Sequence, residues 1–280
     1  MFSAKEVGDY YDQTHVHYEK WWGLRKNLSL HYGIWDENTR TFEESLANTN
    51  AVLLEKAGIR KGDNVLDAGC GVGGAAFFIH KEVGAKVTGL SLSKKQLAFA
   101  QRTVAHRELD EVLNFQFMDF TQTTFPAESF DVVWACESVC HTPDKNDFIK
   151  EAYRLLKKGG RLIMSDFFLT EERQEDKHEW ITKWGNTWGV PNFVSASYFA
   201  SKLDEAGFSK VDLFDYTRNI KKSARRMYAG SLMGAIPSEL YNLFHPRVTR
   251  FAKSHYKCGY YQYKALQEDL WKYKVVLAVK

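Results

Sequence analysis

Short apolar runs alternate with amphipathic segments between residues 64 and 167. The runs have the length and composition of buried strands, and the segments between them carry apolar residues at helical spacing. In chain order, the predicted elements are strands at 64–67, 86–90, 113–118, 130–135 and 161–167, with helices at 73–83, 94–106 and 145–156. This alternation predicts βαβ units, and therefore a parallel sheet that is covered by helices on both faces.

The chain on either side of this stretch is predicted to be mainly helical. After residue 167, two further strands are separated by a segment that is too long for a plain loop, which predicts an inserted helical cap. In chain order, the flanking predictions are helices at 8–22 and 41–57 (the second ending at Gly58), a tryptophan-rich helical excursion at 170–190, a helix at 197–206, strands at 211–216 and 275–279, and cap helices around 224–232 and 239–251.

Composition excludes several classes of protein. Hydrophobic residues make up 44% of the chain and charged residues 26%, which is typical of a folded globular protein. No apolar run is long enough to predict a transmembrane helix, and the N-terminus shows no signal sequence. With 38 basic and 35 acidic residues, the formal charge of +3 is too balanced to favour a nucleic-acid or membrane protein. Aromatic residues, at 15%, favour either a pocket for an apolar or cationic small molecule or simply a large aromatic core.

The cysteines and histidines do not predict a disulfide framework or a metal site. Cys70, Cys136, Cys140 and Cys258 form no CxxC pair, so we interpret all four as reduced and the protein as cytoplasmic. His15 and His17 would not share a helix face, and no zinc motif accompanies them, so no metal is predicted.

A glycine-rich turn follows the first predicted strand. Gly69, Gly71 and Gly74 fit the GxGxxG pattern, in which backbone can approach a ligand closely. A dinucleotide fold also requires an acidic residue about 20 residues later to hold the ribose. Residues 89–93 contain none, and Asp67 is badly placed beside a pyrophosphate but well placed for a cationic or hydroxyl-bearing ligand. An NAD-dependent oxidoreductase is therefore the less favoured interpretation.

Several motifs in the same order resemble class I S-adenosylmethionine-dependent methyltransferases, over roughly residues 60–170 and the last strand. They are the Asp67 to Gly73 turn, Asp119-Phe120 after the third strand, the fourth strand Phe130-Asp131-Val132-Val133, and Leu155 to Leu162 before the fifth. The segments His31 to Asp36 and Cys136 to Asp144 are most similar to small-molecule members of the tocopherol, sterol C-24 and sarcosine/dimethylglycine types. Ser91 departs from the family, because most class I enzymes carry an acidic ribose ligand there.

The resemblance implies a Rossmann-like, seven-stranded, mostly parallel sheet with S-adenosylmethionine as the cofactor. It divides the chain into an N-terminal helical lid (1–60), a cofactor-binding core (61–170), and the remaining strands (171–280), with a substrate cap at about 170–190 and 217–256. The residues it places against the cofactor are Tyr32, Asp67, Gly69, Gly71, Ser91, Leu92, Gln96, Asp119 and Phe120. Asp67 is expected near the methionyl ammonium and Asp119 near the adenine amino group.

Two residues after the fourth strand are candidates for catalysis. Glu137 and His141 follow the carboxyl end of that strand, where ligands bind in open α/β sheets. A carboxylate could steady a developing cation, and a neutral imidazole could take a proton. The alternative is that the pair only anchors the loop.

The sequence thus predicts an enzyme that methylates a small molecule, with the acceptor either apolar or prenylated, or an amine. A non-catalytic protein that binds S-adenosylmethionine is the remaining alternative. The basic run Arg218, Lys221, Lys222, Arg225 and Arg226 could grip a phosphate, but it is too short for a nucleic-acid groove and is interpreted as a solvated face of the cap. The oligomeric state is left open, with a homodimer among the options.

Overall fold

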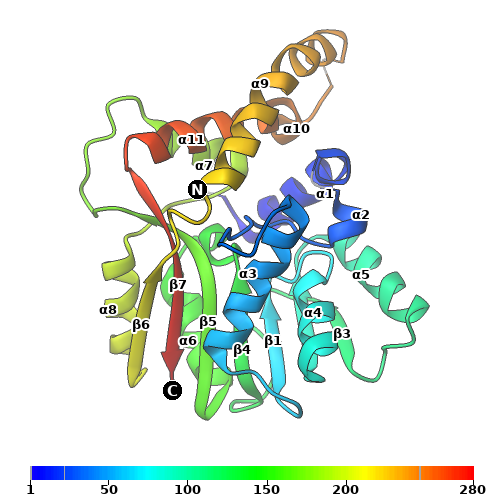
Figure 1. Ribbon diagram of the computed structural model, residues 1–280, viewed down its shortest axis with the longest axis vertical. Helices are drawn as coiled ribbons and strands as arrows, with labels where there is room; N and C mark the ends of the chain where they lie inside the picture. Colours follow the sequence, from blue (N-terminus) through cyan, green and yellow to red (C-terminus); the bar gives the residue numbers. More distant parts are fainter. Residues whose placement is uncertain (1, 22, 246) are drawn as a thin grey trace.

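A seven-stranded sheet forms the centre of the computed structural model, which describes residues 2–21, 23–245 and 247–280 (Figure 1). The strands are β1 (Asn64–Ala68), β2 (Lys86–Ser91), β3 (Leu113–Phe117), β4 (Phe130–Cys136), β5 (Leu156–Leu169), β6 (Lys210–Asp215) and β7 (Trp271–Val279). Their order is β3-β2-β1-β4-β5-β7-β6, with β1 to β5 parallel and β7 antiparallel to both of its neighbours. The predicted mostly parallel, Rossmann-like sheet is confirmed.

The direction of winding reverses at the first strand. The chain moves outward from β1 through β2 to β3, and then returns to β4 on the other side of β1. Val65 accordingly pairs with Val87 on one side and with Val132 on the other. Because the loops that leave β1 and β4 diverge at such a point, a crevice opens at the carboxyl ends of these strands.

Helices cover both faces of the sheet. The helices are α1 (Ala4–Trp21), α2 (Leu24–Asn27), α3 (Phe42–Ala57), α4 (Gly74–Val83), α5 (Lys94–His106), α6 (Lys145–Leu155), α7 (Trp180–Trp188), α8 (Ala196–Ala206), α9 (Lys221–Phe244), α10 (Arg250–Ser254) and α11 (Cys258–Gln267), with short 3₁₀ turns at Val139–His141 and His255–Lys257. Neighbouring strand residues point to opposite faces. Leu66 and Val133 therefore pack with α6 and α8, whereas Val65 and Trp134 pack with α3, α4 and α5.

Most predicted element ends agree with the structure for identifiable reasons. Thr41 and Glu44 form a capping box at the start of α3, and Gly58 ends that helix in the left-handed conformation, with φ 57°. The fifth strand begins at Leu156, earlier than the predicted residue 161, because Leu156 already pairs with Phe130 of β4. The cap also differs from its prediction, since α9 is one helix that continues through Pro237 instead of two separate helices.

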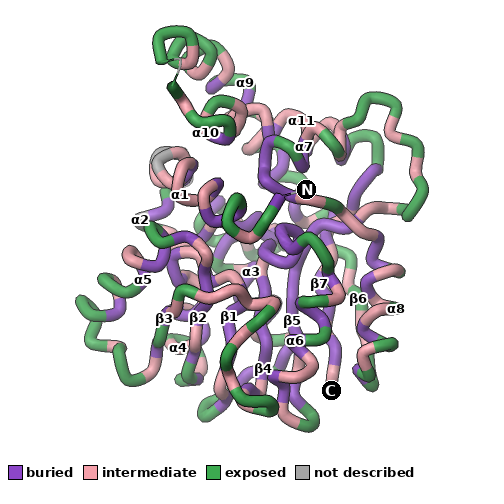
Figure 2. The backbone as a smooth tube through the Cα atoms, turned by 180° about the vertical axis from the view of Figure 1, so that it is seen from behind, coloured by how far each residue is buried: buried purple, intermediate pink, exposed green. Residues whose placement is uncertain are grey.

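A separate aromatic cluster joins the two ends of the chain above the carboxyl ends of the parallel strands. Trp184 and Trp188 of α7 stack at 5.6 Å between ring centroids, and Phe167 of β5 contacts both rings edge-on. Tyr10 of α1 and Trp271 of β7 belong to the same buried cluster. In Figure 2 buried positions accordingly continue from the sheet into parts of α1, α7 and α11, and α1 and α7 supply residues that line the crevice. No helix within the described ranges is both long and apolar enough to cross a bilayer.

Candidate active site

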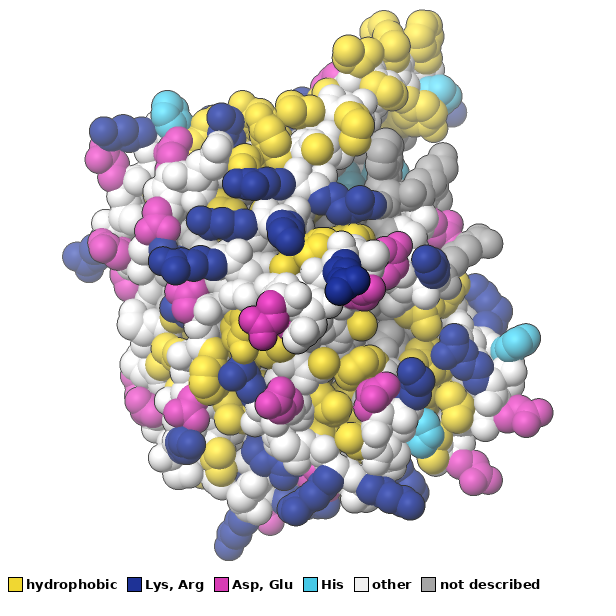
Figure 3. Space-filling model, viewed as in Figure 1, with side chains coloured by type: hydrophobic (Ala, Val, Ile, Leu, Met, Phe, Trp, Pro, Cys, Tyr) yellow, Lys and Arg dark blue, Asp and Glu magenta, His cyan; other side chains and the backbone are white. Residues whose placement is uncertain are grey.

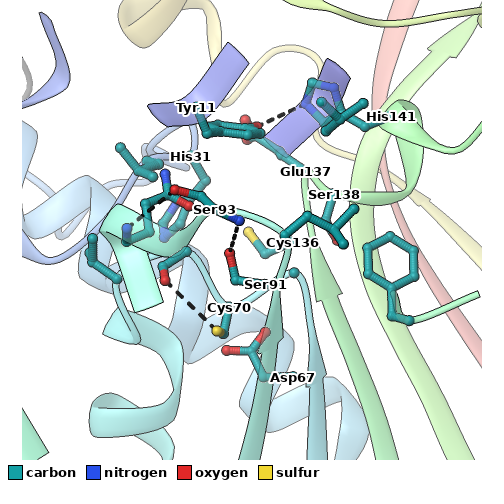
Figure 4. Close-up of a pocket in the computed structure, with 18 of the residues that line it drawn as sticks. Tyr11, His31, Asp67, Cys70, Ser91, Ser93, Cys136, Glu137, Ser138 and His141 are labelled. Carbon is teal, nitrogen blue, oxygen red and sulfur yellow. Dashed lines mark hydrogen bonds between the residues drawn. The ribbon is translucent and has the colours of Figure 1, made fainter. Parts of the chain in front are cut away.

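A cavity lies at the carboxyl ends of β1, β2 and β4, beneath α1 (Figure 4). It measures about 1060 Å³ when the part open to solvent is counted. Ten of the eleven residues that the sequence predicted for the site line it: Asp67, Gly69, Gly71, Ser91, Leu92, Gln96, Asp119, Phe120, Glu137 and His141. In Figure 4, Asp67 lies at one end of the cavity and the Tyr11–His141 pair at the other.

The floor of the cavity is the glycine turn after β1. Gly69 has φ 100°, and a Cβ there would lie 2.3 Å from Cβ of Ser138, so this position requires glycine. The backbone N–H groups of Gly69 and Cys70 both donate to the carbonyl oxygen of Leu90, at 3.1 and 2.8 Å. These bonds tie the turn to β2 and fix its shape.

Asp67 is a buried carboxylate without a partner. Its side chain is 2% exposed, and Oδ2 has no hydrogen-bond partner among the described residues. Burial raises the pKa of Asp67 from 3.8 to about 7, because the ionised form loses its hydration and gains no compensating charge. An uncompensated carboxyl that lines a cavity is suited to receive a cationic group from a ligand.

The second strand delivers polar groups to the adjoining wall. Ser91 Oγ accepts from the N–H of Ser93, and Ser93 Oγ caps α5 by accepting from the N–H of Gln96 at 3.2 Å. The Ser93 hydroxyl also donates to Asp12 of α1 at 2.5 Å, which fastens α1 over the cavity. Gln96 is buried, and its Nε2 has no hydrogen-bond partner in the described part of the chain.

Asp119 and Phe120 form the wall after β3. Oδ1 of Asp119 accepts from both the N–H and the hydroxyl of Thr121, at 2.9 and 2.7 Å, and this turn holds the carboxylate at the rim of the cavity. Phe120 is held edge-on against Phe148 of α6, with ring centroids 5.6 Å apart. A carboxylate beside a fixed aromatic ring suits a flat heterocycle with an amino group.

Glu137 directly follows β4 in a strained backbone conformation. Its φ is 52°, in the left-handed region that non-glycine residues avoid, and such strain clusters at functional sites. The N–H of Glu137 donates to Ser165 of β5 at 2.8 Å. Oε1 accepts from the N–H of Tyr32 at 2.7 Å and from the hydroxyl of Tyr273 at 2.8 Å. Burial raises the pKa of Glu137 from 4.5 to about 8, despite these two hydrogen bonds.

His141 does not present a free nitrogen to the cavity. Its Nδ1 lies 3.2 Å from the carbonyl oxygen of Gly189, which can only accept, so Nδ1 carries the proton. Burial lowers the pKa of His141 to about 4, which keeps the ring neutral. Nε2 is therefore an acceptor, and it receives the hydroxyl proton of Tyr11 at 2.8 Å. The Tyr11 hydroxyl, with its lone pairs free to accept, is the group that this pair presents to the cavity.

The loop that carries Glu137 and His141 is fixed from below by buried charges. Lys145 Nζ donates to the carbonyl oxygens of Cys140 and Thr142, at 2.9 and 2.7 Å. Oδ2 of Asp166 accepts from the N–H of Cys140 at 2.9 Å. These bonds hold the 3₁₀ turn that places His141 beside Trp188 of α7.

Tyr32 is the predicted site residue that lies elsewhere. Its backbone N–H supports Glu137 from behind, and its hydroxyl donates to Gln262 of α11 at 2.5 Å. The ring packs against Phe167 and Tyr273, so Tyr32 joins the lid segment to the sheet and does not line the cavity.

Sequence reasoning missed several lining residues, among them Tyr11, His31, Ser93 and Thr121, whereas Trp188 belongs to the segment 170–190 that was predicted to cap the substrate side. His31 is 7% exposed, and its Nε2 has no hydrogen-bond partner among the described residues. Burial lowers the pKa of His31 to about 4, so the ring is neutral. Ser93 and Thr121 could have been found from the sequence, because both closely follow predicted strand ends. Tyr11 could not, because only long-range packing brings α1 over the cavity.

The cavity fits the cofactor that the sequence predicted. Asp67 Oδ2, Gln96 Nε2 and His31 Nε2 are buried polar atoms that no described residue satisfies, and all three side chains line the same space. Buried polar groups normally have partners. An acceptor, a donor and a neutral imidazole left open around one cavity match a ligand with an ammonium group and several hydroxyl groups.

Comparisons of the sequence agree with this geometry. A family model described as a methyltransferase domain matches residues 66–164, from β1 to β5. The chain is 34% identical to 27-O-demethylrifamycin SV methyltransferase of Amycolatopsis mediterranei, over 81% of this chain and 84% of that protein. It is 33% identical to the sterol 24-C-methyltransferase of Saccharomyces cerevisiae, over 77% of this chain but only 57% of the yeast protein.

Solved structures share the fold over nearly the whole chain. The cyclase SpnF superposes with a TM-score of 0.80 at 22% identity, covering 99% of this chain and 96% of that one. Geranyl diphosphate C-methyltransferase from Streptomyces coelicolor, solved with Mg²⁺, geranyl diphosphate and S-adenosyl-L-homocysteine, superposes with a TM-score of 0.76 at 16% identity, covering 99% and 97%. At these identities the likeness concerns the fold, which hosts both a cyclase and a methyltransferase.

Proposed function

The chain belongs to the S-adenosylmethionine-dependent methyltransferases that act on small molecules, and on that premise we propose that it methylates a hydroxyl group of an apolar acceptor. One observation carries the proposal. The Glu137 carboxyl, which can take a proton once it is ionised, and the Tyr11 hydroxyl, which can accept a hydrogen bond, line a cavity whose apolar lining residues include Val7, Cys136 and Trp188. An acceptor that must lose a proton in a dry, apolar space needs such groups.

The residues near the glycine turn are proposed to hold the cofactor. When bound, S-adenosylmethionine supplies an electrophilic methyl group on a sulfonium. Asp67 binds the ammonium group, Gln96 and Ser91 face the ribose hydroxyls, and Asp119 accepts from the adenine amino group beside Phe120. Gly69 and Gly71 leave the backbone of the turn accessible to the ligand. Residues 1–60 then act as the lid, since Ser93 and Asp12 fasten α1 over this part of the cavity.

Glu137 is proposed to take the proton that the acceptor loses. The Glu137 pKa of about 8 applies to the protein without a cation bound in the cavity. A cation bound in the same cavity lowers that pKa and favours the carboxylate, and loss of that positive charge raises it again. The carboxyl group is thus able to give up its proton before methyl transfer and to hold one afterwards. His141 acts through Tyr11, whose oxygen it orients toward the acceptor hydroxyl.

A second candidate is methylation of an alkene carbon. The relative from Saccharomyces cerevisiae is a sterol 24-C-methyltransferase. A buried carboxyl with a raised pKa, such as Glu137, suits a reaction in which a carbon must lose its proton. An amine acceptor is the least favoured choice, because a neutral amine can attack without first losing a proton.

A panel of acceptors tests the proposed acceptor class. Apolar phenols or alcohols, prenylated alkenes and secondary amines are each incubated with the protein and trideuteriomethyl-labelled S-adenosylmethionine, and products are followed by mass spectrometry. We expect a labelled methyl ether. A labelled methyl group on carbon alone would support the second candidate, and turnover of amines alone would contradict both.

Tyr11→Phe is expected to lower kcat by roughly 10-fold to 100-fold, because the acceptor then loses a buried hydrogen-bond partner. Affinity for S-adenosylmethionine, measured by calorimetry, should stay within about twofold of wild type. If His141 acts only by holding Tyr11, the double variant Tyr11→Phe, His141→Ala should be no slower than the single variants.

The matched control is Tyr18→Phe. Tyr18 also lies in α1 and its ring stacks on Tyr11, but its hydroxyl is paired with the hydroxyl of Tyr10 at 3.1 Å and it does not line the cavity. Its loss should leave kcat near wild type. Wild-type turnover in Tyr11→Phe, combined with a large loss in His141→Ala, would show that His141 itself contacts the acceptor.

A cytoplasmic location completes the proposal. All four thiols, of Cys70, Cys136, Cys140 and Cys258, are free, and three of these cysteines are buried. Free cysteines of this kind are typical of proteins in a reducing compartment.

A further inference from the structure

The second half of α9 carries large apolar side chains that nothing in the described structure covers. The large apolar residues are concentrated in this second half, whereas the first half carries Lys221, Lys222, Arg225 and Arg226. Seven such residues are between 50% and 74% exposed: Leu232, Met233, Ile236, Leu240, Tyr241, Leu243 and Phe244. Figure 3 shows apolar side chains gathered over this end of α9. We call these seven residues the apolar tip.

The same region carries a strong excess of positive over negative residues. Between residues 216 and 257 there are nine Lys or Arg residues and a single acidic residue, Glu239. The segment therefore has a formal charge of +8, whereas the whole chain has +3 and the remainder is net negative. Glu239 is itself paired with Lys257 at 3.2 Å. Along the sequence, basic residues flank the apolar tip, with Lys221, Lys222, Arg225 and Arg226 before it and Arg247, Arg250 and Lys253 after it.

The base of α9 is fixed to the body of the protein. Ser223 Oγ accepts from the N–H of Gly33 and from Nε1 of Trp35, at 3.2 and 3.0 Å. On the opposite side, α11 packs so closely that a Cβ at Gly259 would lie 2.7 Å from the carbonyl oxygen of Met227. The apolar tip consequently projects from the end of the molecule that bears the cavity (Figure 1), in a direction that the fold determines.

Charge and shape distinguish between the possible occupants of the tip. A symmetric contact with a second copy would bring two segments of +8 together, and like charges oppose such an interface. The tip is a projection and not a groove, so it does not form a socket for a peptide or helix. An anionic bilayer attracts clustered cations and accepts the apolar side chains of a helix at its surface.

We propose that α9 docks the protein on the surface of an anionic phospholipid bilayer, with the apolar tip inserted among the lipids. Lys253 and its neighbours Arg247 and Arg250 meet the negative headgroups, since Asn242 Nδ2 beside the tip donates to the carbonyl oxygen of Lys253 at 3.0 Å, and Lys221 to Arg226 add to the attraction from the base of α9. Because the body of the protein fixes the direction of α9, docking turns the end that bears the cavity toward the membrane. Insertion and charge together form the two signals that stable surface binding requires.

Co-flotation with lipid vesicles tests this surface, with the full chain saturated with S-adenosylhomocysteine. One set of vesicles is pure phosphatidylcholine, and the other contains roughly 30 mol% phosphatidylglycerol, at about physiological and at high salt. We expect flotation with the anionic vesicles, at least tenfold weaker binding to the neutral ones, and a marked loss at high salt.

Two sets of substitutions separate insertion from charge. Ile236→Ser, Leu243→Ser and Phe244→Ser together should lower binding to anionic vesicles by roughly 100-fold, because three of the most exposed apolar side chains are lost. Lys221→Gln, Arg225→Gln and Arg247→Gln together should lower it by about tenfold and weaken its salt dependence. Phe117→Ser is the matched control, since Phe117 is an apolar residue 53% exposed on β3, away from the tip.

Cofactor affinity, measured by calorimetry, reports whether each variant is folded and should not change. Wild-type flotation in the triple serine variant would contradict insertion, and equal binding to both kinds of vesicle would contradict the role of charge. The proposal also fails if the wild type does not float but forms a dimer in sedimentation velocity that the triple serine variant abolishes. In that case a second copy covers the tip.

Discussion

Asp67→Asn is expected to weaken binding of S-adenosylmethionine by at least tenfold, which corresponds to about 1.4 kcal/mol. The carboxylate at this position is buried and has no partner in the described structure, so the proposed ammonium contact is its only compensation. An amide keeps the shape of the side chain but removes its charge. Calorimetry at pH 8 measures the effect directly, and wild-type affinity in the folded variant would remove the assigned role of Asp67.

The same substitution should stabilise the protein without cofactor. The folded state holds the Asp67 proton up to a pKa of about 7, whereas an ordinary carboxyl releases it near 3.8. Raising the pH from about 4 to about 7 therefore destabilises the folded state, on the order of 4 kcal/mol once ionisation is complete. The substituted amide cannot ionise, so the variant escapes this cost. We expect a higher Tm than wild type at pH 8 and an equal Tm near pH 4, as measured by calorimetry.

The pH dependence of cofactor binding follows from the same pKa. The ammonium group requires the ionised carboxylate, so wild-type affinity should fall by about tenfold per pH unit below pH 7. In Asp67→Asn this dependence should disappear. Asp63→Asn is the matched control, because Asp63 precedes the opposite end of β1 and pairs with Arg161. It should lower Tm and leave cofactor affinity unchanged.

The fold and the cofactor end of the cavity could be predicted because both depend on local patterns. Strands buried on both faces appear as apolar runs, and Asp67, Ser91 and Asp119 are recognisable because each lies at or near the carboxyl end of one of them. Parallel strands bring those ends to one edge of the sheet, so sequence order is enough to place the three residues around one cavity. Ser93 and Gln96 follow from the start of the next helix.

The acceptor end could not be predicted in the same way, because long-range packing decides it. Tyr11 meets His141 across 130 positions of the chain, and this contact turns an apparent general base into a support for a tyrosine hydroxyl. Tyr32 was expected to face the cofactor, but Thr49 accepts from the N–H of Ile34 and donates to the carbonyl oxygen of Tyr32, which fixes the segment so that the Tyr32 ring packs inward.

Whole-chain composition also concealed a local feature. A formal charge of +3 indicates no particular partner, but it is the sum of a strongly basic cap and a net negative remainder. The exposure of Ile236, Leu243 and Phe244 could not be predicted either, since large apolar side chains are ordinarily buried and only the tertiary structure shows that this end of α9 projects. The basic run Arg218 to Arg226 is exposed, as expected, but it adjoins the apolar tip.

Glu137→Gln is expected to lower kcat by about 10²-fold to 10⁴-fold, the usual contribution of a positioned acid or base. The amide oxygen can still accept from the N–H of Tyr32 and the hydroxyl of Tyr273, so the loop should keep its geometry. At pH 7 the wild-type carboxyl is largely protonated without cofactor, because its pKa is about 8, and the uncharged amide resembles that form. Tm should therefore remain close to wild type, and any loss of cofactor affinity should be small beside the loss of kcat.

The pH profile distinguishes a proton acceptor from a structural carboxyl. For the wild type, kcat/KM for the acceptor should rise with pH and level off at or below about pH 8, because only the ionised Glu137 can take a proton and a bound cation lowers its pKa. Glu137→Gln should lose this rise. Glu151→Gln is the matched control, since that carboxyl is also buried but pairs with Arg154 away from the cavity. Unchanged turnover and an unchanged pH profile in Glu137→Gln would show that another group takes the proton. A loss of cofactor affinity without a loss of kcat would show that Glu137 binds the cofactor instead.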